Sequence, residues 1–348
     1  MDTNRSAYWD NLKAVLIFFV VLGHMLLPAL SDGILIDSVY YWIYLFHMPA
    51  FVFVSGYFSK NYVNRQDKEH KIAGFIALFV LFTFLLFILK LIFEHSIHLG
   101  AFLRPSGAPW YLLSMIFWYL LIPFVSRINT PVAFISLFVI GLLSGLFTDC
   151  GDFLSLSRTI VFFPFFLIGF YFNGNLCDKI RLWMRIVSIV FLLLCALTIF
   201  YYHDALSSFF KVIYGNCSYE EAGLTVKQGI IYRSIWYAVA TIMTVAIMCI
   251  IPKKRWLLTY IGERTLGIYI LHRLIRDIIK YTGLYDYCES EYVLLSVCLL
   301  LSVIITLVTS IRPFASLLSK FLKLSGLFIK KRPNNISDQA CEVKCSPQ

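Results

Sequence analysis

Apolar runs of about 20 residues recur along the whole chain, and polar or charged stretches separate them. A helix needs about 20 mostly apolar residues to cross the hydrocarbon core of a bilayer. The pattern predicts an all-α, polytopic transmembrane bundle of about ten helices. The expected segments lie near residues 12–30, 38–58, 72–93, 110–128, 131–147, 159–172, 182–202, 231–251, 256–272 and 292–311.

Composition narrows the class of protein further. Of the 348 residues, 59% are hydrophobic and 14% are charged, and the mean hydropathy is +0.77. A β-barrel would show short alternating segments instead of long apolar runs. The net charge of +10 indicates no nucleic-acid partner, because the basic residues cluster in short loops. The nine cysteines form no CxxC pair, so no metal site is expected, and a Cys217–Cys288 disulfide is left open.

The charges of the linkers predict the orientation. Three linkers after even-numbered segments are basic, at residues 60–71, 178–185 and 252–256. Short loops rich in lysine and arginine stay on the cytoplasmic side. We therefore expect a multi-pass protein of the cell membrane with both termini in the cytoplasm. Residues 1–312 would form the membrane domain, and residues 313–348 would form a disordered, polar cytoplasmic tail.

Two ionisable residues, Lys13 and His24, interrupt the first apolar segment. They are eleven positions apart, which leaves a rotation of only ~20° between them after three turns and a rise of ~16 Å. Both side chains should therefore lie on one face of the helix. Ionisable residues inside a membrane usually face the bundle interior or a wet cavity. The structural alternatives are a snorkelling anchor for Lys13 and a packed, hydrogen-bonded histidine for His24.

A second histidine, His47, lies at a similar expected depth in the next segment. His24 is about 12 residues from the cytoplasmic face, or ~18 Å, and His47 about 9 residues from the external face, or ~14 Å. The two histidines can then line one cavity in the middle of the membrane, with Lys13 at its cytoplasmic mouth. His272 is expected near the external end of the ninth helix, in an outer vestibule.

Several motifs together resemble the membrane acyltransferase 3 family. Lys13-x10-His24 is similar to its R/K-x10-H signature. Further stretches resemble the branch of fucose 4-O-acetylase-like acetyltransferases, at residues 46–60, 109–120, 163–172 and 262–272, and the similarity covers about residues 8–312. Lys13 stands where many members have arginine. The R-x-x-R pair of many members is replaced by Lys68-x-x-Lys71, with Arg65 upstream.

The resemblance implies transfer of an acyl group, usually acetyl, from cytoplasmic acetyl-CoA to a hydroxyl of a sugar or polysaccharide. An alcohol needs a base within hydrogen-bond reach as it attacks a thioester, and we assign His24 to that role. Lys13 would hold a phosphate or the adenine end of the donor. Arg65, Lys68 and Lys71 would extend this basic mouth, although ordinary loop charge also explains them.

The remaining candidates concern the acceptor. His47 would orient it, polarise the carbonyl group or pass a proton outward, unless it only packs between helices. Trp110 and Tyr111 would stack on a sugar ring or belong to an interfacial aromatic belt. Arg158 would neutralise an oxyanion or anchor its helix, and His272 would contact the acceptor. The alternative function is a proton-coupled exporter of a glycan precursor, although no two-fold repeat is visible.

Overall fold

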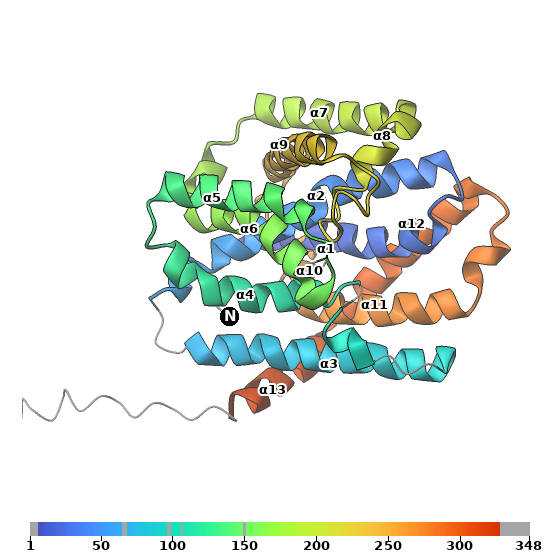
Figure 1. The fold of residues 1–348 in the computed structure, drawn as a ribbon. Coiled ribbons are helices and arrows are strands. Elements are labelled where there is room, and N and C mark those ends of the chain that lie inside the picture. Colours follow the sequence, from blue (N-terminus) through green and yellow to red (C-terminus); the bar gives the residue numbers. More distant parts are fainter. Residues whose placement is uncertain (1–5, 65–67, 96–98, 106, 149–150, 328–348) are drawn as a thin grey trace, which may run out of the picture.

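The computed structural model describes residues 6–64, 68–95, 99–105, 107–148 and 151–327. Within these ranges the regular structure is helical, without a strand (Figure 1). The α-helices are α1 (Ala7–Leu26), α2 (Ile34–Phe58), α3 (Lys68–Glu94), α4 (Trp110–Val125), α5 (Thr130–Leu143), α6 (Leu156–Tyr171), α7 (Leu182–Tyr201), α8 (His203–Phe210), α9 (Val226–Ile250), α10 (Leu257–Gly262), α11 (Thr265–Tyr281), α12 (Glu291–Thr309) and α13 (Arg312–Leu327).

This architecture confirms an all-α bundle of a multi-pass membrane protein. Within the described ranges, seven helical segments are long and apolar enough to cross a membrane, and α4 and α5 are shorter apolar helices. The ninth expected segment differs, because it is divided into α10 and α11 with the break at Glu263 and Arg264. Helix α11 then continues to Tyr281, nine residues beyond His272. Its buried polar side chains explain why hydropathy alone does not delimit it.

The connections between the helices alternate between two ends of the bundle. In Figure 1 the α2–α3, α4–α5 and α6–α7 connections lie on the left, and the α1–α2, α7–α8 and α11–α12 connections lie on the right. The basic linkers that the sequence assigns to the cytoplasm therefore include two on the left. We refer to the left end as the inner end and to the right end as the outer end.

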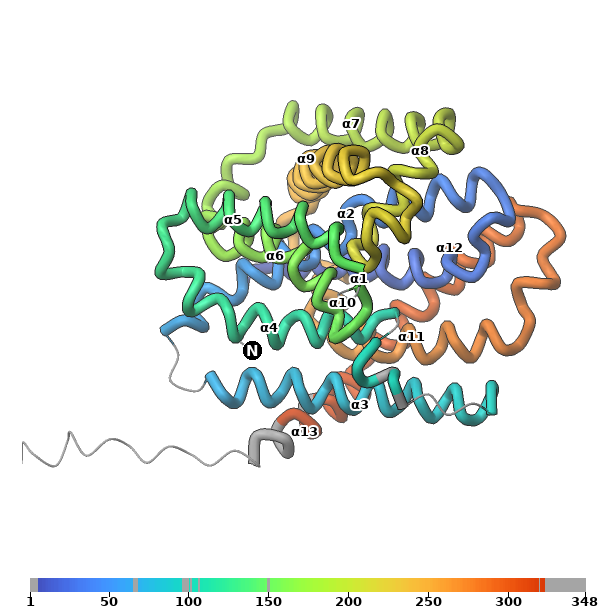
Figure 2. Tube along the Cα trace, viewed as in Figure 1, coloured from blue at the N-terminus to red at the C-terminus, as the bar shows by residue number. Residues whose placement is uncertain are grey.

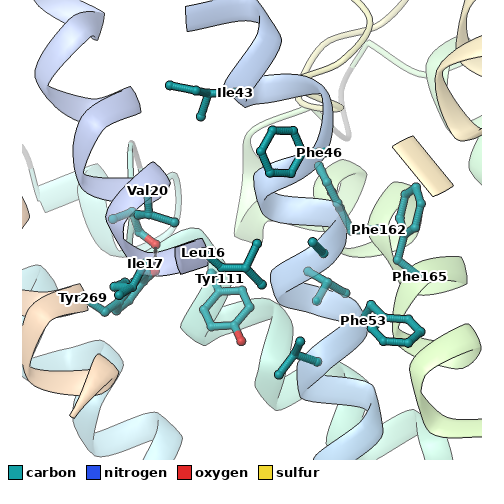
Figure 3. Packing of buried hydrophobic residues seen from close by; sticks show 14 of the residues in the cluster. Leu16, Ile17, Val20, Ile43, Phe46, Phe53, Tyr111, Phe162, Phe165 and Tyr269 are labelled. Carbon is teal, nitrogen blue, oxygen red and sulfur yellow. Dashed lines mark hydrogen bonds between the residues drawn. The ribbon is translucent and has the colours of Figure 1, made fainter. Parts of the chain in front are cut away.

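Helix α1 lies at the centre of the bundle. It contacts α2, α10, α11 and α12, and the tube view in Figure 2 shows it enclosed by them. Its side chains Leu16, Ile17 and Val20 are almost fully buried and belong to the hydrophobic core drawn in Figure 3. Helix α7 lies at the periphery of the bundle and exposes large apolar side chains such as Leu182 and Leu193. Those side chains are suited to contact lipid tails, since lipid is as apolar as leucine.

Helices α2 and α6 cross with their backbones in contact. A Cβ atom added at Gly56 of α2 would meet the backbone oxygen of Phe166, and one added at Gly169 of α6 would meet that of Phe53. Small residues permit such close approach of helices in membranes. The crossing fixes the position of α2, which carries Ser55 and His47 on its way through the bundle.

The C-terminal segment corrects one expectation. Residues 313–348 were expected to be disordered, but Arg312–Leu327 form helix α13, which packs on α3 and α11. The physical reason is an apolar stripe in this segment, since Leu318, Phe321 and Leu322 pack against the core. Residues 328–348 lie outside the described residues. Cys217 and Cys288 are both free thiols, so the disulfide left open by the sequence is not formed.

Candidate active site

A pair of histidines occupies the centre of the site. The rings of His24 (α1) and His272 (α11) have centroids 5.1 Å apart at an angle of 44°. His272 is 1% exposed, so its expected place in an outer vestibule is wrong. The error has a simple cause: α11 extends to Tyr281, which moves His272 from the end of a helix to its middle.

Backbone hydrogen bonds orient two of the imidazole rings. The Nδ1 atom of His272 lies 2.9 Å from the carbonyl oxygen of Ile268, and that of His47 lies 2.8 Å from the carbonyl oxygen of Ile43. A carbonyl only accepts, so Nδ1 carries the proton in both rings and Nε2 is left as an acceptor. The Nε2 atom of His272 and the Nδ1 atom of His24 are buried and have no hydrogen-bond partner.

A chain of aromatic contacts connects the histidine pair to a cavity. The ring of Tyr269 lies 6.0 Å from that of His272 and 5.6 Å from that of Tyr111. The Tyr111 hydroxyl is hydrogen-bonded to Ser55 of α2, and the Tyr269 hydroxyl donates to the carbonyl of Ala108. Both tyrosines are labelled in Figure 3, where they lie close to α1. Both tyrosines line the cavity, and Tyr269 connects its lining to His272.

The cavity has a volume of about 200 Å³, and its lining includes Phe58, the last residue of α2, at the inner end. Its lining comes from α1, α2, α3, α4 and α11, and includes Lys13, Ser55, Tyr111, Tyr119, Thr265 and Tyr269. Most side chains of the full lining are apolar or aromatic, and Lys13 supplies its one cationic group. A narrow, mostly apolar pocket with one cation suits a ligand that has an anionic end and a thin, less polar arm.

Lys13 is held at the edge of this cavity. Its Nζ atom lies 2.7 Å from Oδ1 of Asp10, one turn earlier in α1, and 5.4 Å from the centroid of the Phe58 ring. Lys13 shares the cavity with α11 residues, and His24 contacts His272 of the same helix. Both side chains therefore face α11, in agreement with their eleven-residue spacing.

Of the three basic residues expected to extend the mouth, the structure places Lys71 beside the cavity. Lys71 lies with its Nζ 5.3 Å from the ring centroid of Tyr119, which lines the cavity. Lys68 is the first residue of α3 and is half-buried. Arg65 lies outside the described residues. Lys71 is thus placed beside the cavity mouth, together with Lys13.

The expected acceptor residues do not gather at one place. Tyr111 lines the inner cavity, whereas Trp110 is not part of its lining and lies with its ring centroid 5.5 Å from Arg158. His47, Arg158 and Arg276 are all within electrostatic range of His24. Sequence reasoning missed Arg276, although it stands four residues after His272 and so shares its helix face.

A second, polar cavity lies at the outer end. It has a volume of about 540 Å³, and its lining includes Arg104, Asp152, Asn216 and Glu221. Asp152 connects it to the site, because its Oδ1 atom lies 3.9 Å from Nη2 of Arg158. One cavity thus adjoins the histidine pair through Tyr269, and the other adjoins Arg158 through Asp152.

These features place a buried histidine pair next to a mostly apolar, aromatic-lined cavity that contains one lysine. A family model described as "Acyltransferase domain" matches residues 6–311, and the chain therefore belongs to the acyltransferase 3 family. An enzyme is thus favoured over the exporter considered above. The chain is 36% identical over 67 residues to the nodulation protein NolL of Sinorhizobium fredii, and 34% identical over 67 residues to that of Mesorhizobium japonicum.

Each of these two alignments spans 18% of this chain and 18% of the relative. No solved structure matches the chain. The family assignment consequently rests on the match over residues 6–311.

Proposed function

We propose that this protein transfers an acetyl group from cytoplasmic acetyl-CoA to a hydroxyl group of a sugar or cell-surface glycan, in the cell membrane. The observation that carries the proposal is the His24–His272 pair behind a cavity with a cationic mouth. Membership of the acyltransferase 3 family gives the reaction class. The resemblance of several motifs to sugar O-acetyltransferases supports the choice of acceptor.

The inner cavity is the proposed site of the donor. Coenzyme A has phosphate groups at one end and a long, thin thioester arm at the other. Lys13 and Lys71 are placed to bind the phosphate groups at the mouth, because ammonium groups form strong hydrogen bonds to phosphate oxygens. The arm then enters the cavity along Tyr111 and Tyr269, and the thioester carbonyl reaches the histidine pair. Lys68 and Arg65 would add to the attraction for the donor.

His24 acts as the general base in this scheme. A ring nitrogen of His24 accepts the proton of the acceptor hydroxyl while the oxygen attacks the thioester carbon. The tetrahedral intermediate collapses, its carbon–sulfur bond breaks, and the imidazolium returns the proton to the departing thiolate. The products are the acetyl ester and free coenzyme A. His272 and His47 orient the reacting groups from α11 and α2, through their unprotonated Nε2 atoms.

Acetyl-CoA turnover by the purified protein in nanodiscs tests this proposal. Free thiol release is followed with a panel of sugar acceptors for the wild type, His24→Asn and His95→Asn. His95 is exposed at the end of α3 with a φ of 51°, and asparagine tolerates that backbone conformation. We expect acceptor-dependent release from the wild type and His95→Asn, and a loss of at least 100-fold in His24→Asn. Undiminished release from His24→Asn would overturn the assignment of the base.

A further inference from the structure

Three arginines lie at the outer side of the histidine pair, of which Arg273 and Arg276 are buried and Arg158 is partly buried. Arg158 lies near the start of α6, and Arg273 and Arg276 lie on α11. The Arg273 and Arg276 side chains both contact one carboxylate, since their Nη1 atoms lie 3.2 Å and 2.9 Å from Oδ1 of Asp277. Two guanidinium groups therefore share one negative charge.

Arg158 is compensated even less. Asp152 is 3.9 Å away, and the Asp152 side chain is 56% exposed, whereas that of Arg158 is 15% exposed. The Nη1 atom of Arg158 and the Nε atoms of Arg273 and Arg276 are buried without a hydrogen-bond partner. Buried polar groups are normally hydrogen-bonded, and a buried charge is costly unless it is paired.

The surroundings of Asp277 do not remove this imbalance. Lys90, Lys280 and Glu94 lie within electrostatic range of Asp277, which adds two further cations and one anion. Glu94 is itself bonded to the hydroxyl of Tyr281 at 2.5 Å. Around Asp277 four cations, Arg273, Arg276, Lys90 and Lys280, thus face the two carboxylates of Asp277 and Glu94. The unpartnered guanidinium nitrogens can accommodate a further anion.

The position of the cluster indicates which ligand it serves. Arg158 and Arg276 are both within electrostatic range of His24 and of Tyr44. Arg276 follows His272 by one helical turn, and Arg158 adjoins Asp152 in the lining of the outer cavity. The donor phosphates belong at Lys13, which is ~16 Å from His24 along α1. An anion bound at the arginines would therefore belong to the acceptor.

We propose that the acceptor glycan carries an anionic group, a phosphate or a carboxylate, and that Arg158 and Arg276 bind it while the sugar hydroxyl lies at His24. This inference rests on the proposed function. Guanidinium groups bind both anions through paired, planar N–H donors. The outer cavity gives the acceptor its entrance, and the arginines determine which sugars are positioned for reaction.

The test compares three acceptors that share one oligosaccharide core: a neutral form, a form with a uronate and a form with a phosphate. Thiol release from acetyl-CoA gives kcat/KM for each acceptor. We expect the wild type to prefer at least one anionic form over the neutral form by ~10-fold or more. Comparison of the uronate and phosphate acceptors then identifies which anionic group the arginines bind.

Three variants complete the experiment. Arg158→Gln and Arg276→Gln should each abolish the preference for the anionic acceptor, measured as the ratio of kcat/KM for the anionic acceptor to kcat/KM for the neutral one. Arg276→Lys should keep part of the preference, because it retains the charge. Arg127→Gln is the control, since Arg127 is exposed in the loop after α4, and it should behave as the wild type. The preference is a ratio measured within each variant, so a partly unfolded sample does not change it.

Two results would overturn the inference. Equal kcat/KM for neutral and anionic acceptors in the wild type would refute the anionic acceptor but would leave the proposed acetyltransferase function supported. An equal loss of kcat/KM on all acceptors in Arg158→Gln and Arg276→Gln would instead show that the arginines stabilise the transition state and do not select the acceptor. Absence of thiol release from the wild type with every acceptor would overturn the proposed function itself, and this inference with it.

Discussion

Replacement of Gly56 by alanine tests whether backbone contact between α2 and α6 holds the site together. The added Cβ would be forced against the backbone oxygen of Phe166, which cannot move without displacing α6. Overpacking of this kind costs about 1–3 kcal/mol. Alanine is also a better helix former than glycine by about 1 kcal/mol, so the net loss is smaller than the cost of the clash.

A matched variant separates these two effects. At Gly74 of α3 an added Cβ would find the side chain of Leu322 at 3.5 Å, which is ordinary van der Waals contact. Gly74→Ala therefore receives the gain in helix propensity without the clash. The difference between Gly56→Ala and Gly74→Ala should equal the overpacking cost, about 1–3 kcal/mol. Gly169→Ala, on the other side of the same crossing, should resemble Gly56→Ala.

Unfolding in one detergent, followed by heating or by titration with sodium dodecyl sulfate, measures these differences. We expect Gly74→Ala to be as stable as the wild type or more stable, and Gly56→Ala and Gly169→Ala to be less stable than it. The double variant Gly56→Ala/Gly169→Ala should lose less than the sum of the single losses, because helices that have already separated relieve both clashes. Equal stability of Gly56→Ala and Gly74→Ala would refute the close crossing.

Three further predictions concern the donor, the inner end and the topology. Lys13→Ala should raise KM for acetyl-CoA by ~10-fold or more, and Lys13→Arg by less, in a kinetic titration of the donor; an unchanged KM in Lys13→Ala would remove Lys13 from the donor site. Asn11, which is 0% exposed, donates to the carbonyls of Pro252 and Lys254 at 2.8 and 2.9 Å, so Asn11→Ala should lower the melting temperature by an amount equivalent to ~2 kcal/mol or more, because buried acceptors lose their partner. In a cysteine-free background, Lys254→Cys should react with a thiol reagent only from the cytoplasmic side and Glu220→Cys only from outside; the reverse pattern would contradict the orientation of the bundle.

Local patterns in the sequence were sufficient to predict the helical bundle and the polar face of its central helix, α1. Hydropathy located the long helices because each apolar run must be buried in lipid or protein whatever its neighbours are. The 3.6-residue period placed Lys13 and His24 on one side of α1, and in the structure both face α11. The amphipathic helix α13 could also have been predicted, since leucine and phenylalanine recur at helical spacing in residues 312–327.

The composition of the site depended on the tertiary structure. His24 and His272 are 248 positions apart in the sequence, and no local pattern indicates that their rings come within 5.1 Å. Helix α11 begins after the break at Glu263 and Arg264, and its packing against α1 brings His272 to His24. Periodicity determines which side of a helix is polar, but only the packing of whole helices decides which polar sides meet.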